Sequence, residues 1–334
     1  MMPVTTKSSR FATVGGVRMH YLDFGGSGPV LLFVHGGQDH AHTWDFIAPA
    51  FTDSHRVFAV DLRGHGDSDW VSGGLYTALE HVIDLAGLGA SLSSEPLRLV
   101  GHSFGSTVCL RWAGLQPSRV EMVAAIEGFG PPPTHPSQVL PRAEYLRDWV
   151  NVRVRQDSGA GRRTYATVDE AARRIREVNP RLSPELAGHL AAHGTRRQAD
   201  GGLTWKFDPA VRQWAPYGLD RHEAVEIYSL VTCPVLILRG LDSWVADPAA
   251  NPLVQALPRR AVVDVASAGH WVHHDQAEHV ITTLRAWLRG PESTVKSSAR
   301  LSGAPRQQFH GPSVRVATPL AREANNPNTK DILQ

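Results

Sequence analysis

The pentapeptide Gly101-His102-Ser103-Phe104-Gly105 places a serine between two glycines in the order Gly-x-Ser-x-Gly. A serine hydroxyl becomes a strong nucleophile when a neighbouring base removes its proton. A serine held on a sharp turn from a strand to a helix has a strained backbone, so the residues two positions to either side must be small. Gly101 and Gly105 meet that requirement, and the sequence therefore predicts Ser103 as the nucleophile of an acyl-transfer reaction.

The base predicted for this serine is His270, in the segment Ala268-Gly269-His270-Trp271. The segment follows the last apolar run and precedes the last amphipathic helical pattern, where this kind of site carries its histidine. Such a base needs a carboxylate that fixes its tautomer and stabilises the imidazolium ion.

Two carboxylates are candidates for that role. Asp242 follows the apolar run Val235–Leu238 and gives the chain order serine, aspartate, histidine. Glu127 follows another apolar run, Met122–Ile126, and would approach the same histidine from the tip of a neighbouring strand. The sequence favours Asp242 and leaves Glu127 as the alternative acid.

Acyl transfer also requires hydrogen-bond donors for the oxyanion that develops on the substrate. The backbone N–H of Phe104, directly after the nucleophile, is one predicted donor. The second is predicted at Gly37, in the loop His35-Gly36-Gly37-Gln38-Asp39, because glycines let the backbone approach a substrate closely. Three tryptophans are candidates for the walls of the substrate pocket: Trp44, Trp244 and Trp271.

Short apolar runs supply the strands that would position these residues. Continuous apolar strands are typical of a parallel sheet covered on both faces, and the helical patterns between them indicate helices on both sides. The Gly15-Gly16 pair between two strand-like runs predicts a hairpin. The predicted strands are Phe11–Val14, Val17–Leu22, Val30–Val34, Val57–Val60, Leu97–Val100, Met122–Ile126, Val235–Leu238 and Ala261–Val265.

The pattern changes at Pro131, and about a hundred residues follow without a buried-strand run. We interpret residues 131–230 as a mostly helical cap inserted into a core domain formed by residues 1–130 and 231–290. Residues 291–334 contain few large apolar side chains, and we predict that this tail is disordered. Helical patterns within the cap cover residues 141–154, 168–178 and 184–193.

Composition narrows the functional classes. The formal net charge is +2, and the tail holds six basic and three acidic residues, so the rest of the chain is close to neutral and no nucleic-acid partner is expected. No apolar stretch reaches the length of a membrane span or a signal peptide. The two cysteines, Cys109 and Cys233, are better read as buried hydrophobic residues than as a disulfide. These features predict a cytoplasmic protein without a membrane partner.

Over residues 10 to 290 the chain resembles the α/β-hydrolase superfamily. The resemblance rests on His35-Gly36-Gly37, on the run Asp61-Leu62-Arg63-Gly64-His65-Gly66-Asp67-Ser68, on the Ser103 pentapeptide, and on the loops of Asp242 and His270. It implies a mostly parallel eight-stranded sheet flanked by helices, with an inserted helical cap, and a structural role for the Asp61–Ser68 run. One departure is that Leu241 alone separates Gly240 from Asp242, which keeps Glu127 open as the acid.

The predicted function is that of a serine hydrolase acting on a small-molecule carboxylic ester, thioester or lactone through an acyl-enzyme. No cofactor and no metal are expected, because the cluster His35, Asp39, His40 and His42 lacks the ligand order of metallo-β-lactamase-type hydrolases. A serine at position 103 also argues against haloalkane dehalogenases and epoxide hydrolases, which use aspartate there. The alternatives are a C–C bond hydrolase, lyase or cofactor-free haloperoxidase with the same triad, or a non-catalytic small-molecule receptor of the same fold.

Overall fold

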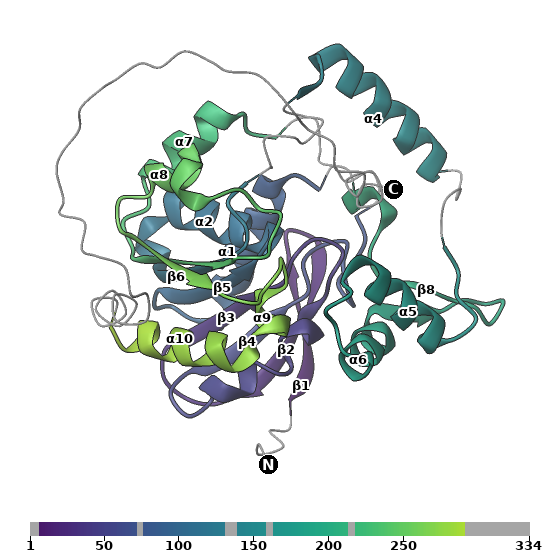
Figure 1. Ribbon diagram of the computed structural model, residues 1–334, viewed down its shortest axis with the longest axis horizontal. Coiled ribbons are helices and arrows are strands. Elements are labelled where there is room, and N and C mark those ends of the chain that lie inside the picture. The colour runs from purple at the N-terminus through teal and green to yellow at the C-terminus, as the bar shows by residue number, and fades with distance from the viewer. Residues whose placement is uncertain (1–6, 72–75, 131–138, 158–162, 213–217, 291–334) are drawn as a thin grey trace.

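A single eight-stranded sheet forms the central layer of the protein, with helices on both faces and a smaller unit to one side (Figure 1). The computed structural model describes residues 7–71, 76–130, 139–157, 163–212 and 218–290. The predicted fold class, an α/β-hydrolase fold built on a mostly parallel sheet, is confirmed. The tail at 291–334 and the start of the expected cap at 131–138 lie outside the described residues.

Each of the predicted apolar runs forms a strand of this sheet. The strand order is β1-β2-β4-β3-β5-β6-β9-β10, with β2 antiparallel to β1 and β4 and the remaining pairs parallel. The strands are β1 (Ser8–Val14), β2 (Val17–Gly25), β3 (Val30–Val34), β4 (Arg56–Val60), β5 (Leu97–His102), β6 (Val120–Ile126), β9 (Val235–Gly240) and β10 (Arg260–Val265).

The continuous apolar character of the central strands follows from their position between two layers of helices. Successive side chains of a strand point to opposite faces. In β3, Leu32 and Val34 pack into one buried cluster, while Leu31 and Phe33 pack into the other. Both faces of the strand therefore need apolar residues.

Two groups of helices close these clusters. The first cluster is covered by α1 (Ala78–Leu92), α2 (Phe104–Leu115), α7 (Arg221–Ser229) and α8 (Pro252–Ala256). The second is covered by the 3₁₀ helices η1 (Ala41–Trp44) and η2 (Ala48–Phe51) together with α9 (Val272–Asp275) and α10 (Ala277–Arg289). Short 3₁₀ turns at η3 (Pro117–Arg119) and η5 (Pro248–Ala250) complete the connections.

The segment between β6 and β9, where the sequence predicts the cap, has a small apolar cluster of its own. Its helices are α4 (Arg142–Asp157), α5 (Val168–Val178) and α6 (Pro184–Gly194), which match the three predicted helical patterns. The sequence analysis missed the hairpin of β7 (Thr195–Arg197) and β8 (Leu203–Trp205), which is followed by η4 (Pro209–Arg212). The buried residues of this cluster are Tyr165, Ala171, Ala172, Leu182, Ala187, Leu190, Ala191 and Leu203.

The expected cap boundary at residue 230 differs from the packing. Helix α7 lies within the range 131–230, yet its residues Ala224, Ile227 and Tyr228 belong to a core cluster of the sheet domain. A side chain at Gly114 of α2 would collide with the backbone of Ile227, so the two helices touch at the glycine. Helix α7 is therefore part of the core, and a region without strands was too coarse a criterion for the boundary.

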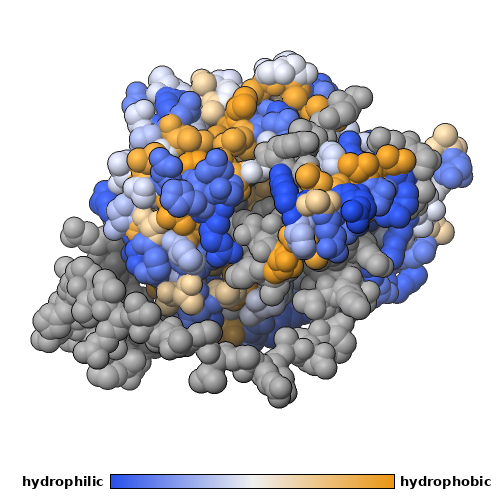
Figure 2. Space-filling view, turned by 90° about the horizontal axis from the view of Figure 1, so that it is seen from above, coloured by the Kyte–Doolittle hydropathy of each residue, from blue (hydrophilic) through white to orange (hydrophobic). Residues whose placement is uncertain are grey.

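Three further features of the described residues concern the surface, the two cysteines and the possibility of a membrane span. Apolar patches interrupt the hydrophilic surface on the face seen in Figure 2, and Val150 and Val154 of α4 are among the exposed apolar residues of the chain. Cys109 and Cys233 are buried and free, as expected. Among the described residues, no helix combines the length and the apolar character needed to cross a membrane.

Candidate active site

Ser103 occupies a strained turn between β5 and α2. Its backbone dihedrals are φ 50° and ψ −118°, in a region that non-glycine residues rarely adopt. A Cβ atom at Gly101 would lie 2.6 Å from the backbone nitrogen of Ser106, and one at Gly105 would overlap the carbonyl oxygen of His35. The glycines are thus required by close backbone packing, which fixes the serine at the carboxyl end of the central strand.

His270 lies directly against this serine. Its Nε2 atom is 3.0 Å from Ser103 Oγ, and its side chain is buried beside the rings of Trp244 and Trp271, whose centroids lie 4.7 and 5.2 Å from its own. Burial lowers the pKa of His270 to about 4. The imidazole is therefore neutral at pH 7, which is the form that accepts a proton.

The carboxylate that reaches His270 belongs to Glu127, at the end of β6. Its Oε2 atom lies 3.3 Å from His270 Nδ1. The backbone N–H of Gly240 donates to Oε1 at 2.7 Å, and the hydroxyl of Ser243 donates to Oε2. Burial raises the pKa of Glu127 to about 7, and the hydrogen bonds from Ser243 and Gly240 act in the opposite direction. Ser103, His270 and Glu127 thus form a continuous chain of hydrogen-bonding groups.

Asp242, the acid favoured by the sequence, points elsewhere. Its Oδ2 atom accepts a hydrogen bond of 2.7 Å from Arg181 Nη2 of the cap, and 47% of its side chain is exposed. The backbone N–H of Asp242 bonds to the carbonyl of Ala268 at 2.9 Å. In this loop it is Ser243, the residue after Asp242, that bonds to Glu127. The carboxylate beside His270 is therefore that of Glu127, the alternative acid, whereas the favoured Asp242 pairs with Arg181 instead.

The elbow also supplies a contact that the sequence analysis did not assign. His102, the residue before the nucleophile, donates from Nε2 to the carbonyl oxygen of His270 at 2.9 Å. Burial and the neighbouring His270 hold the pKa of His102 well below its usual range, so this ring is neutral. Its place in the pentapeptide was the only sequence signal for this role.

The predicted oxyanion loop runs directly beside the nucleophile. A Cβ atom at Gly36 would lie 2.9 Å from His102 Nδ1 and 3.2 Å from Ser103 Cβ, whereas one at Gly37 would meet nothing within 4 Å. Phe104 follows the serine directly as the first residue of α2. The two segments that carry the predicted donors, at Gly37 and Phe104, therefore both adjoin Ser103.

The Asp61–Ser68 run folds around its own first carboxylate. Asp61 accepts hydrogen bonds from the backbone of Ala41 at 2.6 Å and of Asp67 at 2.8 Å, and its Oδ2 lies 2.7 Å from Nδ1 of the buried His20. A Cβ atom at Gly66 would collide with this carboxylate. These contacts agree with the structural role that the resemblance implied for the run.

The three tryptophans differ in position. Trp44 is fully buried in the second core cluster, with ring centroids of Phe33 and His273 at 5.1 and 4.7 Å, so it is a core residue and the prediction of a pocket wall is wrong there. Trp244 is 57% exposed and Trp271 is half-buried, and both rings contact His270. These two remain candidates for the pocket.

Comparisons with known proteins agree with this architecture. A 2-(acetamidomethylene)succinate hydrolase of Mesorhizobium japonicum is 30% identical over 84% of this chain and 95% of its own length. The esterase Rv0045c of Mycobacterium tuberculosis is 27% identical over 80% of this chain and 85% of its own. The solved thioesterase domain from the curacin biosynthetic pathway superposes with a TM-score of 0.74 at 24% identity, covering 84% of this chain and 99% of that one.

The family assignment comes from a family sequence model that matches the sheet domain together with the segment between β6 and β9. Residues 29–277 match the sequence model described as the alpha/beta hydrolase fold. That range includes the nucleophile elbow, Glu127 and the His270 loop. The chain belongs to the alpha/beta hydrolase fold family, a family of hydrolases.

Proposed function

We propose that the protein is a serine hydrolase that cleaves a small-molecule carboxylic ester, thioester or lactone through an acyl-enzyme formed on Ser103. The observation that carries the proposal is the distance of 3.0 Å between His270 Nε2 and Ser103 Oγ, in a histidine whose ring is neutral. A neutral imidazole at hydrogen-bonding distance from a hydroxyl is the arrangement required of a general base.

The reaction proceeds in two halves. His270 takes the proton of Ser103 as Oγ attacks the substrate carbonyl carbon, and the oxyanion accepts hydrogen bonds from the backbone N–H groups of Phe104 and Gly37. The imidazolium then protonates the leaving alcohol or thiol, or the alkoxide of an opened lactone, as the carbon–heteroatom bond breaks. In the second half His270 deprotonates a water molecule, which attacks the acyl-enzyme; the imidazolium then returns the proton to Ser103 Oγ as the bond to the acyl carbon breaks and the acid is released.

Glu127 is the proposed acid of the triad. Its carboxylate accepts the Nδ1–H of His270, which fixes the tautomer with Nε2 toward the serine. Because the site is buried, the negative charge of Glu127 stabilises the imidazolium more strongly than an exposed carboxylate would. Ser243 and Gly240 hold the carboxylate in place, so the loop after β9 contributes hydrogen bonds instead of the acid.

The relatives support a hydrolase without specifying one bond type or substrate. Their names give 2-(acetamidomethylene)succinate for one protein, while another is called an esterase. A screen of acyl esters and thioesters that varies chain length and charge is the direct way to find the acyl group. Turnover of a diketone without ester hydrolysis would favour the C–C bond hydrolase alternative.

Labelling with a fluorophosphonate probe tests the proposal without a known substrate. Intact-mass analysis should show one adduct, peptide mapping should place it on Ser103, and Ser103→Ala should abolish it because the phosphonylated oxygen is gone. Ser229→Ala, which removes an exposed hydroxyl on α7, is the matched control and should label like the wild type. Unchanged labelling of Ser103→Ala would refute the proposed nucleophile.

A further inference from the structure

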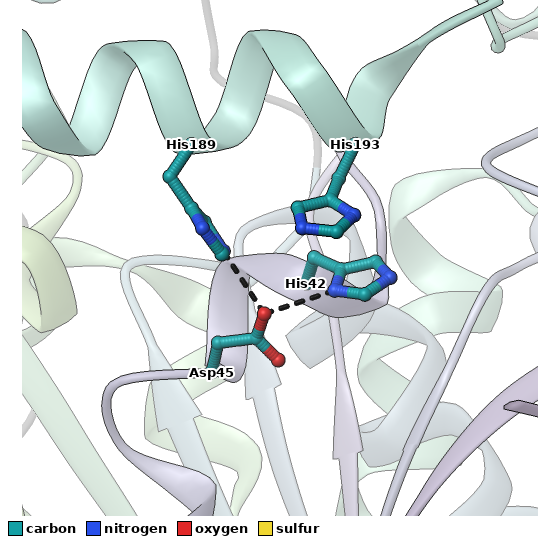
Figure 3. A group of neighbouring side chains, drawn as sticks. All are labelled: His42, Asp45, His189 and His193. Atoms are coloured by element: carbon teal, nitrogen blue, oxygen red, sulfur yellow. Dashed lines mark hydrogen bonds and ion pairs between the residues drawn. The ribbon is translucent and has the colours of Figure 1, made fainter. Parts of the chain in front are cut away.

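A cluster of three histidines and one aspartate lies where the cap meets the core. We propose that His42, Asp45, His189 and His193 bind a divalent transition-metal ion of the Zn²⁺ type and thereby join the cap helix α6 to the core. One ligand atom from each of the four side chains lies within 4.8 Å of every other. Figure 3 shows the four side chains converging from two separate elements.

Local geometry brings the ligands together in pairs. His189 and His193 are four residues apart on α6, so they lie on one face of the helix. His42 belongs to η1 and Asp45 is its C-cap residue, three positions later. Residues three apart eclipse in a 3₁₀ helix, so this second pair also shares a face. The two faces meet across the junction (Figure 3).

The contacts already approach those of a coordination sphere. Asp45 Oδ2 lies 2.9 Å from His42 Nδ1 and 2.9 Å from His189 Nε2, and the rings of His42 and His193 stack with centroids 3.7 Å apart. In a tetrahedral zinc site with bonds of about 2.0–2.1 Å, neighbouring ligand atoms are about 3.4 Å apart. The printed separations of the ligand atoms, all within 4.8 Å, are thus close to those of such a site.

The backbones that carry these ligands are held by other contacts. His40, beside η1, donates from Nε2 to the carbonyl of Leu190 in α6 at 3.0 Å. A Cβ atom at Gly194 would lie 2.8 Å from the same His40 nitrogen, so the end of α6 approaches the core as closely as a glycine allows. The ligand pairs are therefore held face to face by protein contacts alone. The free energy of metal binding is not reduced by a cost of docking α6 on the core.

The ammonium group of Lys7 lies beside the cluster and places a positive charge next to Asp45. Its ammonium donates to Asp45 Oδ2 and lies 3.1 Å from His42 Nδ1. Since an ammonium has no lone pair, Lys7 is a competitor for these two ligand atoms and cannot itself coordinate a metal. Binding of the ion therefore displaces Lys7 and removes the proton that His189 Nε2 donates to Asp45.

The ligand chemistry selects the class of ion. Imidazole nitrogens with one carboxylate suit Zn²⁺, Co²⁺, Ni²⁺ and Cu²⁺, whereas Mg²⁺ and Ca²⁺ prefer oxygen ligands. None of the four residues belongs to the proposed triad, so the ion takes no part in acyl transfer. No metal was expected from the sequence, because the cluster His35, Asp39, His40 and His42 lacks the ligand order of metallo-β-lactamase-type hydrolases. That cluster did not include His189 and His193, which lie far along the chain on α6.

The test is a Zn²⁺ titration of the full chain against a chromophoric chelator, with Co²⁺ absorption as a second readout of tetrahedral coordination. The wild type should bind one Zn²⁺ that Mg²⁺ does not displace. His189→Gln and His193→Gln should each weaken binding at least about tenfold. Lys7→Met should strengthen it, because the competing ammonium is gone. His279→Gln, which changes an exposed histidine of α10, is the matched control and should leave the affinity unchanged.

Two results would overturn the proposal. One is Zn²⁺ binding of equal stoichiometry and affinity in the wild type and in His189→Gln/His193→Gln, since the ion would then bind elsewhere or not at all. The other is an unchanged affinity in Lys7→Met, which keeps all four ligands and so remains informative if a histidine variant fails to fold. Circular dichroism identifies such a failure.

Discussion

The carboxylate of Glu127 lies 3.3 Å from Nδ1 of His270, although the two residues are 143 positions apart in the chain. The sheet explains the contact, because β6 lies beside β9 and β9 beside β10, so the loops at their carboxyl ends share one edge. Glu127 extends this pairing through its backbone N–H, which bonds to the carbonyl of Leu238 at 3.1 Å. The position of the Glu127 carboxylate beside His270 is therefore set by strand order.

The pH dependence of nucleophile activation should report this pair. Burial raises the pKa of Glu127 to about 7 and lowers that of His270 to about 4. The active forms of both groups are deprotonated, so the rate of fluorophosphonate labelling should rise with pH through a midpoint of about 7 and level off at higher pH. In Glu127→Gln the rise should shift to lower pH, toward the titration of His270 alone. An unchanged midpoint in this variant would show that Glu127 does not titrate with the reaction.

His102 should act as a positioning residue for the base. His102→Leu removes the N–H that holds the carbonyl of His270 and leaves that buried oxygen without this partner. We expect labelling of Ser103 to slow about tenfold and the free energy of unfolding to fall by about 1–3 kcal/mol. His102→Gln, whose amide can donate to the same oxygen, should restore much of the labelling rate at comparable stability. Equal rates in the two variants would contradict the role of the hydrogen bond.

The oxyanion loop offers a matched pair of glycine substitutions. Gly36→Ala places a methyl group 2.9 Å from His102 Nδ1 and 3.2 Å from Ser103 Cβ, so the nucleophile or the loop must move. A displacement near 1 Å costs about a hundredfold in rate. The methyl group of Gly37→Ala meets no protein atom within 4 Å and the backbone N–H is kept, so we expect a smaller loss of labelling rate than in Gly36→Ala. A slower rate in Gly37→Ala than in Gly36→Ala would reverse this account of the loop.

The elements of the fold were predictable because their signals are local. Apolar runs such as Val30–Val34 and the helical patterns of the cap depend on neighbours within a few residues, and each appears in the structure. Ser103 and His270 were identifiable because a glycine-rich turn and a loop after the last strand are also local features. The structure brings their side chains together as the sequence analysis expected.

The remaining site depended on long-range packing. Asp242 and Glu127 both follow sheet strands, and only the turn geometry of the loop shows that Ser243 bonds to Glu127 while Asp242 pairs with Arg181. Trp44 is likewise a large aromatic residue near the oxyanion loop in sequence, but η1 turns its side chain into the core. The directions in which these side chains point depend on tertiary contacts, and the spacing of residues along the chain does not reveal them.

The identity of the acid is the central claim, and the second-order rate of Ser103 labelling by a fluorophosphonate measures it most directly. The account predicts a fall of about 10³–10⁴-fold in Glu127→Gln, as expected for loss of a triad carboxylate. It predicts a change of less than about threefold in Asp242→Asn, because that side chain is half exposed and pairs with Arg181. A larger loss in Asp242→Asn than in Glu127→Gln would contradict the account.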